Sequence, residues 1–171
     1  TPLELAKNLT NRFGNEIWLK REDLQPVFSF KLRGAYNRMS QLDKKQLSKG
    51  VIASSAGNHA QGVALSAAFL NCKAVIVMPI TTPLTKVKAV HGHKAEVILH
   101  GETYDESYQE AMRISKNEGL TFIHPFDDPE VIAGQGTIGV EILRQSEKPP
   151  DAIYVAVGGG GLISGISVYI K

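Results

Sequence analysis

The chain has 171 residues, of which 43% are hydrophobic, and its 19 Lys and Arg residues nearly balance its 17 Asp and Glu residues, giving a formal net charge of +2. This length is typical of one domain or of part of a larger one, and the hydrophobic fraction argues against a disordered chain. The balanced charge favours neither nucleic acid nor a membrane surface as a partner. We therefore expect a small ligand bound in a cleft.

Cysteine content and hydropathy indicate the kind of cellular compartment in which the protein is expected. Cys72 is the only cysteine, so the chain forms no internal disulfide and has no zinc-type cysteine spacing, which favours a reducing compartment. No apolar run approaches the ~20 residues that span a bilayer, and no charged-then-apolar leader opens the chain. The sequence begins at Thr1 and stops at Lys171 within an apolar stretch, so we expect a piece of a longer protein.

The first predicted elements are a helix over residues 1–14, a strand over 17–20 and a helix from 30 or 31 to about 42. Thr1 is a candidate cap for the first helix, with Pro2 at the first helical position and Glu4 where a capping-box carboxylate belongs. Ser29 is the candidate cap of the second helix.

From residue 51 onward, apolar runs alternate with helical patterns. The predicted strands are 51–53, 73–78, 96–99, 121–123 and 152–157; the predicted helices are 58–70, 84–90, 104–117, 136–144 and one from 162. This alternation predicts βαβ units, hence an α/β fold with a parallel sheet and helices on both faces. Ligands of such sheets bind at the carboxyl ends of the strands, so the strand-to-helix turns are the candidate sites.

Four consecutive glycines, Gly158–Gly161, follow the last predicted strand. Glycine lets the backbone approach a ligand closely, and successive N–H groups at a helix start bind anions, which favours a phosphate site over a plain tight turn. No Lys-Ser or Lys-Thr pair follows, so this is not a Walker A loop, and a dinucleotide fingerprint fits only loosely. The glycines alone leave a dinucleotide and other phosphorylated cofactors open.

A second candidate turn is the stretch Ser54–Gly62, which follows the strand predicted at 51–53 and opens a helix. Its serines, glycine and asparagine offer hydrogen-bond donors to a carboxylate or a phenolate-like oxygen. An ordinary helix cap needs only one such residue, so their density favours a binding site.

A third candidate is the stretch Ser29–Ala35, with Lys31 in the first turn of its predicted helix. We expect the positive end of the helix dipole and the nearby Arg33 to disfavour the charged form of the amine. A lysine of this kind can form a Schiff base. Taken alone, however, the lysine is better explained as an ordinary solvated side chain.

Together these stretches resemble the threonine dehydratase family, in the tryptophan-synthase-β-like group of pyridoxal-phosphate enzymes. The resemblance covers all 171 residues, with the motifs in the family's order and spacing, including Lys20–Asp23 and Ala133–Thr137. It implies pyridoxal 5'-phosphate as cofactor. It also implies an α/β fold of two open parallel-sheet domains (fold type II), truncated in this sequence.

The resemblance assigns roles to individual residues. Lys31 would hold the cofactor through a carbon–nitrogen double bond and act as the base, with Phe30 beside the ring and Asn58 hydrogen-bonded to the cofactor's 3′ oxygen. The phosphate would be held by Gly158, Gly159, Gly160, Gly161 and the N–H of Leu162. The substrate carboxylate would be held by the loop containing Ser55, Gly57, Asn58 and His59.

The activity implied is dehydration and deamination of L-threonine to 2-oxobutanoate and ammonia, as the first step of isoleucine biosynthesis, with L-serine as a second substrate. Residues 1–48 and 130–171 would belong to a large domain and residues 49–129 to a small inserted one, which closes on the substrate. Serine racemases of this group carry a serine where this chain has Ala56, so racemisation should be poor. A homo-oligomer, a cytoplasmic or plastid location and a C-terminal domain sensing isoleucine or valine are further expectations.

Other functions remain open at this point: a catabolic serine/threonine dehydratase, a serine racemase, a nicotinamide-dependent dehydrogenase, and a non-catalytic fragment that binds a phosphorylated ligand. We assign no metal site, because His91 and His93 lack a nearby third ligand. His100 and His124, at strand ends, are interpreted as structural. Cys72 is interpreted as a small buried residue and not a reactive thiol.

Overall fold

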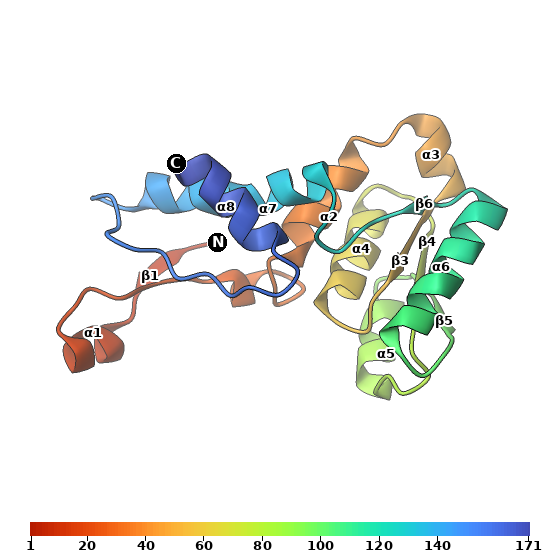
Figure 1. The fold of residues 1–171 in the computed structure, drawn as a ribbon, viewed down its shortest axis with the longest axis horizontal. Helices are drawn as coiled ribbons and strands as arrows, with labels where there is room; N and C mark the ends of the chain where they lie inside the picture. Colours follow the sequence, from red (N-terminus) through yellow and green to blue (C-terminus); the bar gives the residue numbers. More distant parts are fainter.

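The computed structural model describes residues 1–171, and a parallel four-stranded sheet forms the core of one half of it (Figure 1). The strands are β3 (Val51–Ser54), β4 (Ala74–Met78), β5 (Glu96–Leu99) and β6 (Thr121–Phe122), in the order β5-β4-β3-β6. All three neighbouring pairs are parallel, with Val51 opposite Ala74 and Thr121. The predicted α/β class and parallel sheet are confirmed.

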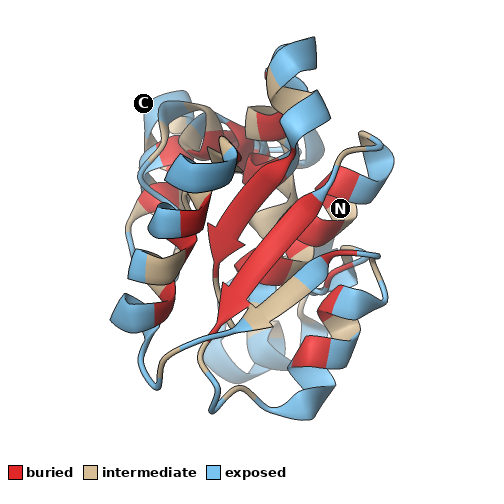
Figure 2. Ribbon diagram, turned by 90° about the vertical axis from the view of Figure 1, so that its right-hand side faces the viewer, coloured by how far each residue is buried: buried red, intermediate tan, exposed pale blue.

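The two central strands are rich in β-branched residues and are buried along their whole length, as Figure 2 shows in red. Such continuous apolar runs are typical of parallel strands covered on both faces. On one face, α4 (Asn58–Phe69) and α5 (Leu84–His91) pack on Val51, Ala53 and Ile76. On the other, α6 (Tyr104–Glu118) packs on Ile52, as the two-residue period of a strand requires.

The other half of the molecule is built on three helices: α2 (Lys31–Ser40), α7 (Pro129–Gln145) and α8 (Gly161–Ile170). Their contacts rely on glycine. A Cβ on Gly134 would lie 2.6 Å from the Arg33 carbonyl oxygen in α2, and one on Gly136 would lie 2.8 Å from the Gly165 carbonyl oxygen in α8. Close backbone approach therefore fixes how the three helices cross.

The N-terminal prediction was wrong in its first residues. Leu3–Leu5 is a strand, β1, which pairs antiparallel with β2 (Trp18–Lys20); the helix α1 (Lys7–Phe13) begins only after it. Pairing with β2 supplies the hydrogen bonds that a helix from Thr1 would have made locally. The predicted end is confirmed, since Gly14 has a left-handed φ of 69°.

Helix α2 begins at Lys31, as predicted, but its predicted cap and the predicted start of α7 were wrong. Ser29 makes no cap hydrogen bond to α2, and its hydroxyl is buried without a partner. Helix α7 begins at Pro129, seven residues before the predicted 136, because Asp128 accepts hydrogen bonds from the N–H groups of Glu130 and Val131. A short helix, α3 (Lys44–Lys49), was missed although Asp43 and Gln46 form a capping box.

The strand predicted over 152–157 is absent. This segment pairs with no other strand of the structure, and Tyr154 and Val157 are 97% and 64% exposed. An apolar run becomes a strand only where another strand accepts its hydrogen bonds, and no strand within residues 1–171 does so. No helix is both long and apolar enough to cross a bilayer.

Candidate active site

One short segment, Ile123–Phe126, lies just beyond the carboxyl end of β6 and contacts all three predicted motifs. The Ile123 carbonyl oxygen is 2.8 Å from His59 Nε2, and the Pro125 carbonyl oxygen accepts a hydrogen bond from Lys31 Nζ at 2.6 Å. Phe126 lies against the glycines at the start of α8. Residues far apart in the sequence therefore converge at the carboxyl end of the sheet, where ligands of α/β proteins bind.

Lys31 is the first residue of α2, and its amine is directed toward Pro125. Its Nζ lies 5.4 Å from the centre of the Phe30 ring. Burial lowers the pKa of this amine, because a partly desolvated ammonium loses hydration. The neutral form needed for nucleophilic or basic chemistry is thus favoured, as predicted.

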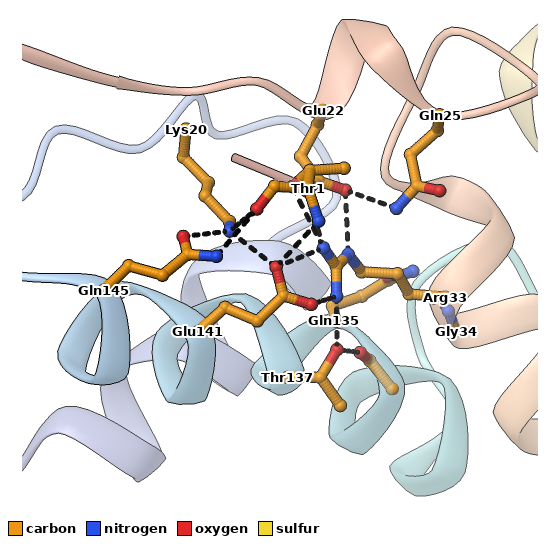
Figure 3. A network of polar contacts seen from close by, with 11 residues as sticks. Thr1, Lys20, Glu22, Gln25, Arg33, Gly34, Gln135, Thr137, Glu141 and Gln145 are labelled. Carbon is orange, nitrogen blue, oxygen red and sulfur yellow. Dashed lines mark hydrogen bonds and ion pairs between the residues drawn. The ribbon is translucent and has the colours of Figure 1, made fainter. Parts of the chain in front are cut away.

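The predicted contribution of Arg33 to this lowered pKa was wrong, since burial is the only cause found. The Arg33 guanidinium is instead held between two carboxylates, at 2.7 Å from Glu22 and 2.6 Å from Glu141 (Figure 3). Lys20 also binds Glu141, at 2.5 Å. The network joins the segment around β2 to α2 and α7, and it neutralises Arg33 locally.

The turn between β3 and α4 has the expected donors. Ser55 Oγ accepts a hydrogen bond from the N–H of Gly57 at 3.1 Å, and Asn58 is exposed at the first position of α4. Further along the helix, a Cβ on Gly62 would lie 3.1 Å from the carbonyl carbon of Lys31. Glycine at this position lets α4 approach the residue that carries the candidate amine.

The imidazole of His59 lies within hydrogen-bond distance of the backbone of Ile123. It is only 3% exposed, and burial lowers its pKa to about 4. Because a carbonyl oxygen only accepts, Nε2 carries the proton donated to Ile123, and Nδ1 is left buried without a partner. Any contact of His59 with a carboxylate would therefore use its backbone N–H.

The glycine turn has the properties of an anion cradle. Gly158 and Gly160 face open space, whereas a Cβ on Gly161 would lie 2.7 Å from the carbonyl oxygen of Phe126 and one on Gly159 would strike its ring. Gly160 has a φ of +86°, and no side chain caps the N–H groups of α8, which include that of Leu162. One side of the turn is packed and the other is open to a ligand, which fits a phosphate group.

Sequence reasoning missed Pro125 and Phe126 as parts of this region. A hydrogen bond through a backbone carbonyl leaves no trace in residue type, so Pro125 could not be singled out. The signal that was available is position: both follow directly on a predicted strand, at the edge where the other two turns lie.

The chain matches the family model described as pyridoxal-phosphate dependent enzyme over residues 1–171. It belongs to this family. This membership explains the combination of a buried lysine and a glycine turn, and it establishes the cofactor class to which the site is suited.

Individual relatives are similar over the whole of this chain. It is 63% identical over 171 residues to a protein named threonine dehydratase biosynthetic, chloroplastic, from Arabidopsis thaliana, and 58% identical over 174 residues to a biosynthetic L-threonine dehydratase from Burkholderia multivorans. It covers 29% and 34% of these two proteins. The chain thus spans about a third of the curated relatives it matches.

Solved structures agree on the fold. The processed form of threonine deaminase isoform 2 from Solanum lycopersicum superimposes with a TM-score of 0.97 at 56% identity, covering all of this chain and 47% of that one. Maize serine racemase gives 0.96 at 36% identity, with 52% of its chain covered. The fold is therefore that of the tryptophan-synthase-β-like enzymes.

Features outside this region show no comparable chemistry. No group of three or more His, Cys, Asp or Glu residues is placed to hold a metal ion. Cys72 is only partly buried, and burial raises the pKa of its thiol, which disfavours the thiolate. A pocket of about 450 Å³ beside Cys72 includes Ala74 and therefore opens at the amino end of β4, opposite the edge where the three motifs meet.

Proposed function

We propose that the full-length protein uses pyridoxal phosphate to dehydrate and deaminate L-threonine to 2-oxobutanoate and ammonia, with L-serine as a slower substrate. The observation that carries this proposal is the Lys31 amine, half-buried with a lowered pKa and hydrogen-bonded to Pro125, whose neighbour Phe126 packs against the glycine turn. The similarity to proteins named threonine dehydratase supports the choice of substrate.

The residues present fit this cofactor, so we assign them roles toward it. Gly158–Gly161 and the N–H of Leu162 would bind the phosphate, as the open side of the turn allows. Lys31 would hold the cofactor covalently, Phe30 would pack beside its ring, and Asn58, exposed at the start of α4, would hydrogen-bond its ring oxygen. When bound, pyridoxal phosphate supplies an electron sink for negative charge at the α-carbon of an amino acid.

The chain itself would bind, orient and exchange protons. The N–H and hydroxyl donors of Ser55, Gly57, Asn58 and His59 would hold the substrate carboxylate and so fix the α-carbon. The neutral amine of Lys31 would remove the α-proton, a step that requires an unprotonated base within reach. The lowered pKa of this amine shifts it toward the unprotonated form.

We propose that residues 49–129 form the small domain, with residues 1–48 and 130–171 in the large domain. The sheet from β3 to β6 falls within the first range, and α2, α8 and all of α7 except its first residue, Pro129, fall within the second. Ile123–Phe126 lies where the two adjoin. Closure of the small domain on the substrate would exclude water and bring the Ser55–His59 loop onto the carboxylate.

Serine racemisation is the second candidate activity, because maize serine racemase shares the fold at 36% identity. Racemisation needs a proton donor on the face of the substrate opposite the lysine. Ala56, within the carboxylate-binding loop, has no exchangeable proton, which favours elimination. We expect full-length protein to interconvert L- and D-serine far more slowly than it dehydrates threonine.

We further propose the biosynthetic role, with threonine deamination as the first step toward isoleucine, since relatives of this kind carry that name. A homo-oligomer and control by isoleucine or valine through a C-terminal domain complete the proposal. A bacterial or plant source would imply the cytoplasm or the plastid; one relative is named as mitochondrial.

Borohydride trapping of the full-length protein tests the function. We expect reduction in the presence of pyridoxal phosphate to leave a pyridoxyl group on the peptide containing Lys31, detected by mass spectrometry. Lys31→Ala should abolish the label and lower threonine deamination by at least about 1,000-fold, as loss of a covalent base-catalyst does. Lys49→Ala, at an exposed helix end, is the matched control and should leave both unchanged.

Retention of deamination by Lys31→Ala, or label on another lysine, would refute the assignment. Reduction of a nicotinamide on substrate addition would support a dehydrogenase instead. A protein that binds the phosphorylated ligand but releases no 2-oxobutanoate would be a binding protein.

A further inference from the structure

His124 is the first residue of the turn, residues 124–127, that follows β6. Its Nδ1 atom is 2.8 Å from the backbone nitrogen of Asp127 and 3.3 Å from that of Phe126. Both backbone groups are donors, so Nδ1 accepts from both and the ring proton resides on Nε2. The imidazole thereby closes the turn over residues 124–127 with two side-chain-to-backbone hydrogen bonds.

Aromatic neighbours hold this ring in place. The His124 ring lies 4.8 Å from that of Phe126 at 84° and 6.1 Å from that of Phe122 at 66°, both edge-to-face. Such geometry stabilises aromatic pairs beyond the area they bury. Burial lowers the pKa of His124 despite the nearby Asp127 and Asp128, which shifts the ring toward its neutral form, the form that can accept at Nδ1.

The turn closed by His124 carries two contacts of the candidate site. The Pro125 carbonyl oxygen receives the Lys31 amine, and the Phe126 carbonyl and ring lie directly against Gly161 and Gly159. The orientation of two consecutive residues therefore sets both the position of the amine and the packed side of the glycine turn. A rotation of either peptide unit would therefore move both the Lys31 amine and the packed side of the glycine turn.

We propose that His124 is a positioning residue that, by binding the N–H groups of Phe126 and Asp127, fixes the Pro125–Phe126 peptide and thereby places the Lys31 amine relative to the phosphate-binding glycines. The inference rests on the proposed function, since it concerns the same site. It assigns to His124 a role that differs from a general contribution to folding.

The two hydrogen bonds to His124 Nδ1 indicate which side chains can take over the function of the histidine. An asparagine side-chain oxygen commonly accepts hydrogen bonds from the N–H groups two and three residues ahead, which are the two donors here. Glutamine carries the same amide one methylene farther out and cannot close so tight a turn. Both substitutions remove the aromatic contacts of the histidine ring. A difference in cofactor affinity between the two variants therefore measures the effect of the hydrogen-bond acceptor alone.

The test compares His124→Asn with His124→Gln in the full-length apoprotein. The dissociation constant of pyridoxal phosphate is measured by absorbance titration, and the borohydride-trapped fraction on the Lys31 peptide by mass spectrometry. The expected result is about a tenfold weaker affinity and reduced trapping for His124→Gln, the factor that loss of one or two net hydrogen bonds supplies. For His124→Asn both should stay within about threefold of the original protein.

His91→Asn is the matched control, because His91 is exposed at the end of α5, away from the site. Thermal unfolding of the apoproteins is recorded in parallel. A purely structural role would lower the unfolding temperature of both His124 variants and leave their cofactor affinities alike.

Two results would overturn the inference. One is that His124→Gln binds pyridoxal phosphate as tightly as the original protein. The other is that both variants lose the same tenfold in affinity for the cofactor. If His124→Gln fails to fold, His124→Asn decides by itself: retained affinity supports the positioning role, and a tenfold loss with unchanged unfolding refutes it. Failure of the original protein to bind the cofactor at Lys31 would instead refute the proposed function, and the inference with it.

Discussion

Two segments of this chain have the same plan, an apolar run followed by a turn of small residues and a helix, yet they adopt different structures. Val51–Ser54 is strand β3, paired on both sides and fully buried, and it leads through Ser55–Gly57 into α4. Residues 152–157 lead through the glycine turn into α8 but have no strand partner, and Tyr154 is 97% exposed.

The comparison shows that the turn and the strand before it are stabilised separately. The Ser55 turn is fixed by the sheet, because the N–H of Ser55 donates to Val77 of the neighbouring strand. The glycine turn is fixed from the other side, by Phe126 and by the close crossing of α7 and α8. Within residues 1–171, contacts on this other side hold the glycine turn although the run before it has no strand partner among these residues.

The largest expected effect is a difference in unfolding free energy between substitutions in β3 and in residues 152–157. Ile52→Ala removes a side chain that is 0% exposed in the β3 core and should lower the free energy of unfolding by about 2–5 kcal/mol. Val157→Ala, in the unpaired segment and 64% exposed, should cost less than about 1 kcal/mol. Urea denaturation of this chain and of each variant measures both, and equal losses would contradict the contrast.

The pH dependence of unfolding tests whether the His59 imidazole, which follows the Ser55–Gly57 turn, is buried in its neutral form. Folding lowers the pKa of His59 from 6.5 to about 4, so between these values the unfolded chain binds a proton that the folded chain does not. Stability from this group is complete above about pH 6.5 and decreases as the pH falls to about 4, by up to about 3 kcal/mol.

His59→Gln isolates this contribution, because glutamine does not titrate and can still donate to the Ile123 carbonyl oxygen. The stability difference between the original chain and the variant should vary with pH between about 4 and 6.5 and be constant above it. A difference independent of pH throughout would show that His59 is not buried in its neutral form.

The smallest expected effect compares one glycine from each turn. A Cβ on Gly161 would lie 2.7 Å from the Phe126 carbonyl oxygen, a backbone atom, whereas a Cβ on Gly57 has nothing within 4 Å. Gly161→Ala should therefore destabilise this chain by about 1–3 kcal/mol and Gly57→Ala by less than about 0.5 kcal/mol. Thermal unfolding distinguishes them, and a larger loss for Gly57→Ala would contradict the packing described.

Much of the sheet was predictable because its elements are encoded locally. The strand predicted over 96–99 has those bounds in β5, and the helices that became α4, α5 and α6 were each placed to within a residue or two. Periodicity and chain length suffice there, since each element packs against its sequence neighbours. Two of the errors lie at Leu3–Leu5 and at 152–157, where the presence or absence of a distant strand decides.

In the candidate site, too, some features were predictable from the sequence and others were not. The residue types and spacing of Lys31, the Ser55–His59 stretch and Gly158–Gly161 indicate a covalent lysine, a carboxylate and a phosphate only through the family resemblance that they carry together. The direction of the His59 imidazole toward Ile123 and the neutralisation of Arg33 by Glu22 and Glu141 were not predictable. These depend on groups brought together from different parts of the chain.

The amino-acid sequence by itself determined the α/β class, the family and the residue types of the site, because these follow from local periodicity and from motifs whose chemistry is carried by residue identity. Only the tertiary structure decided that Ile123–Phe126 joins the three motifs and that the Lys31 amine meets the Pro125 carbonyl oxygen. The physical reason is that a backbone carbonyl has the same chemistry at every position. Its role is set by the folded position of its peptide unit.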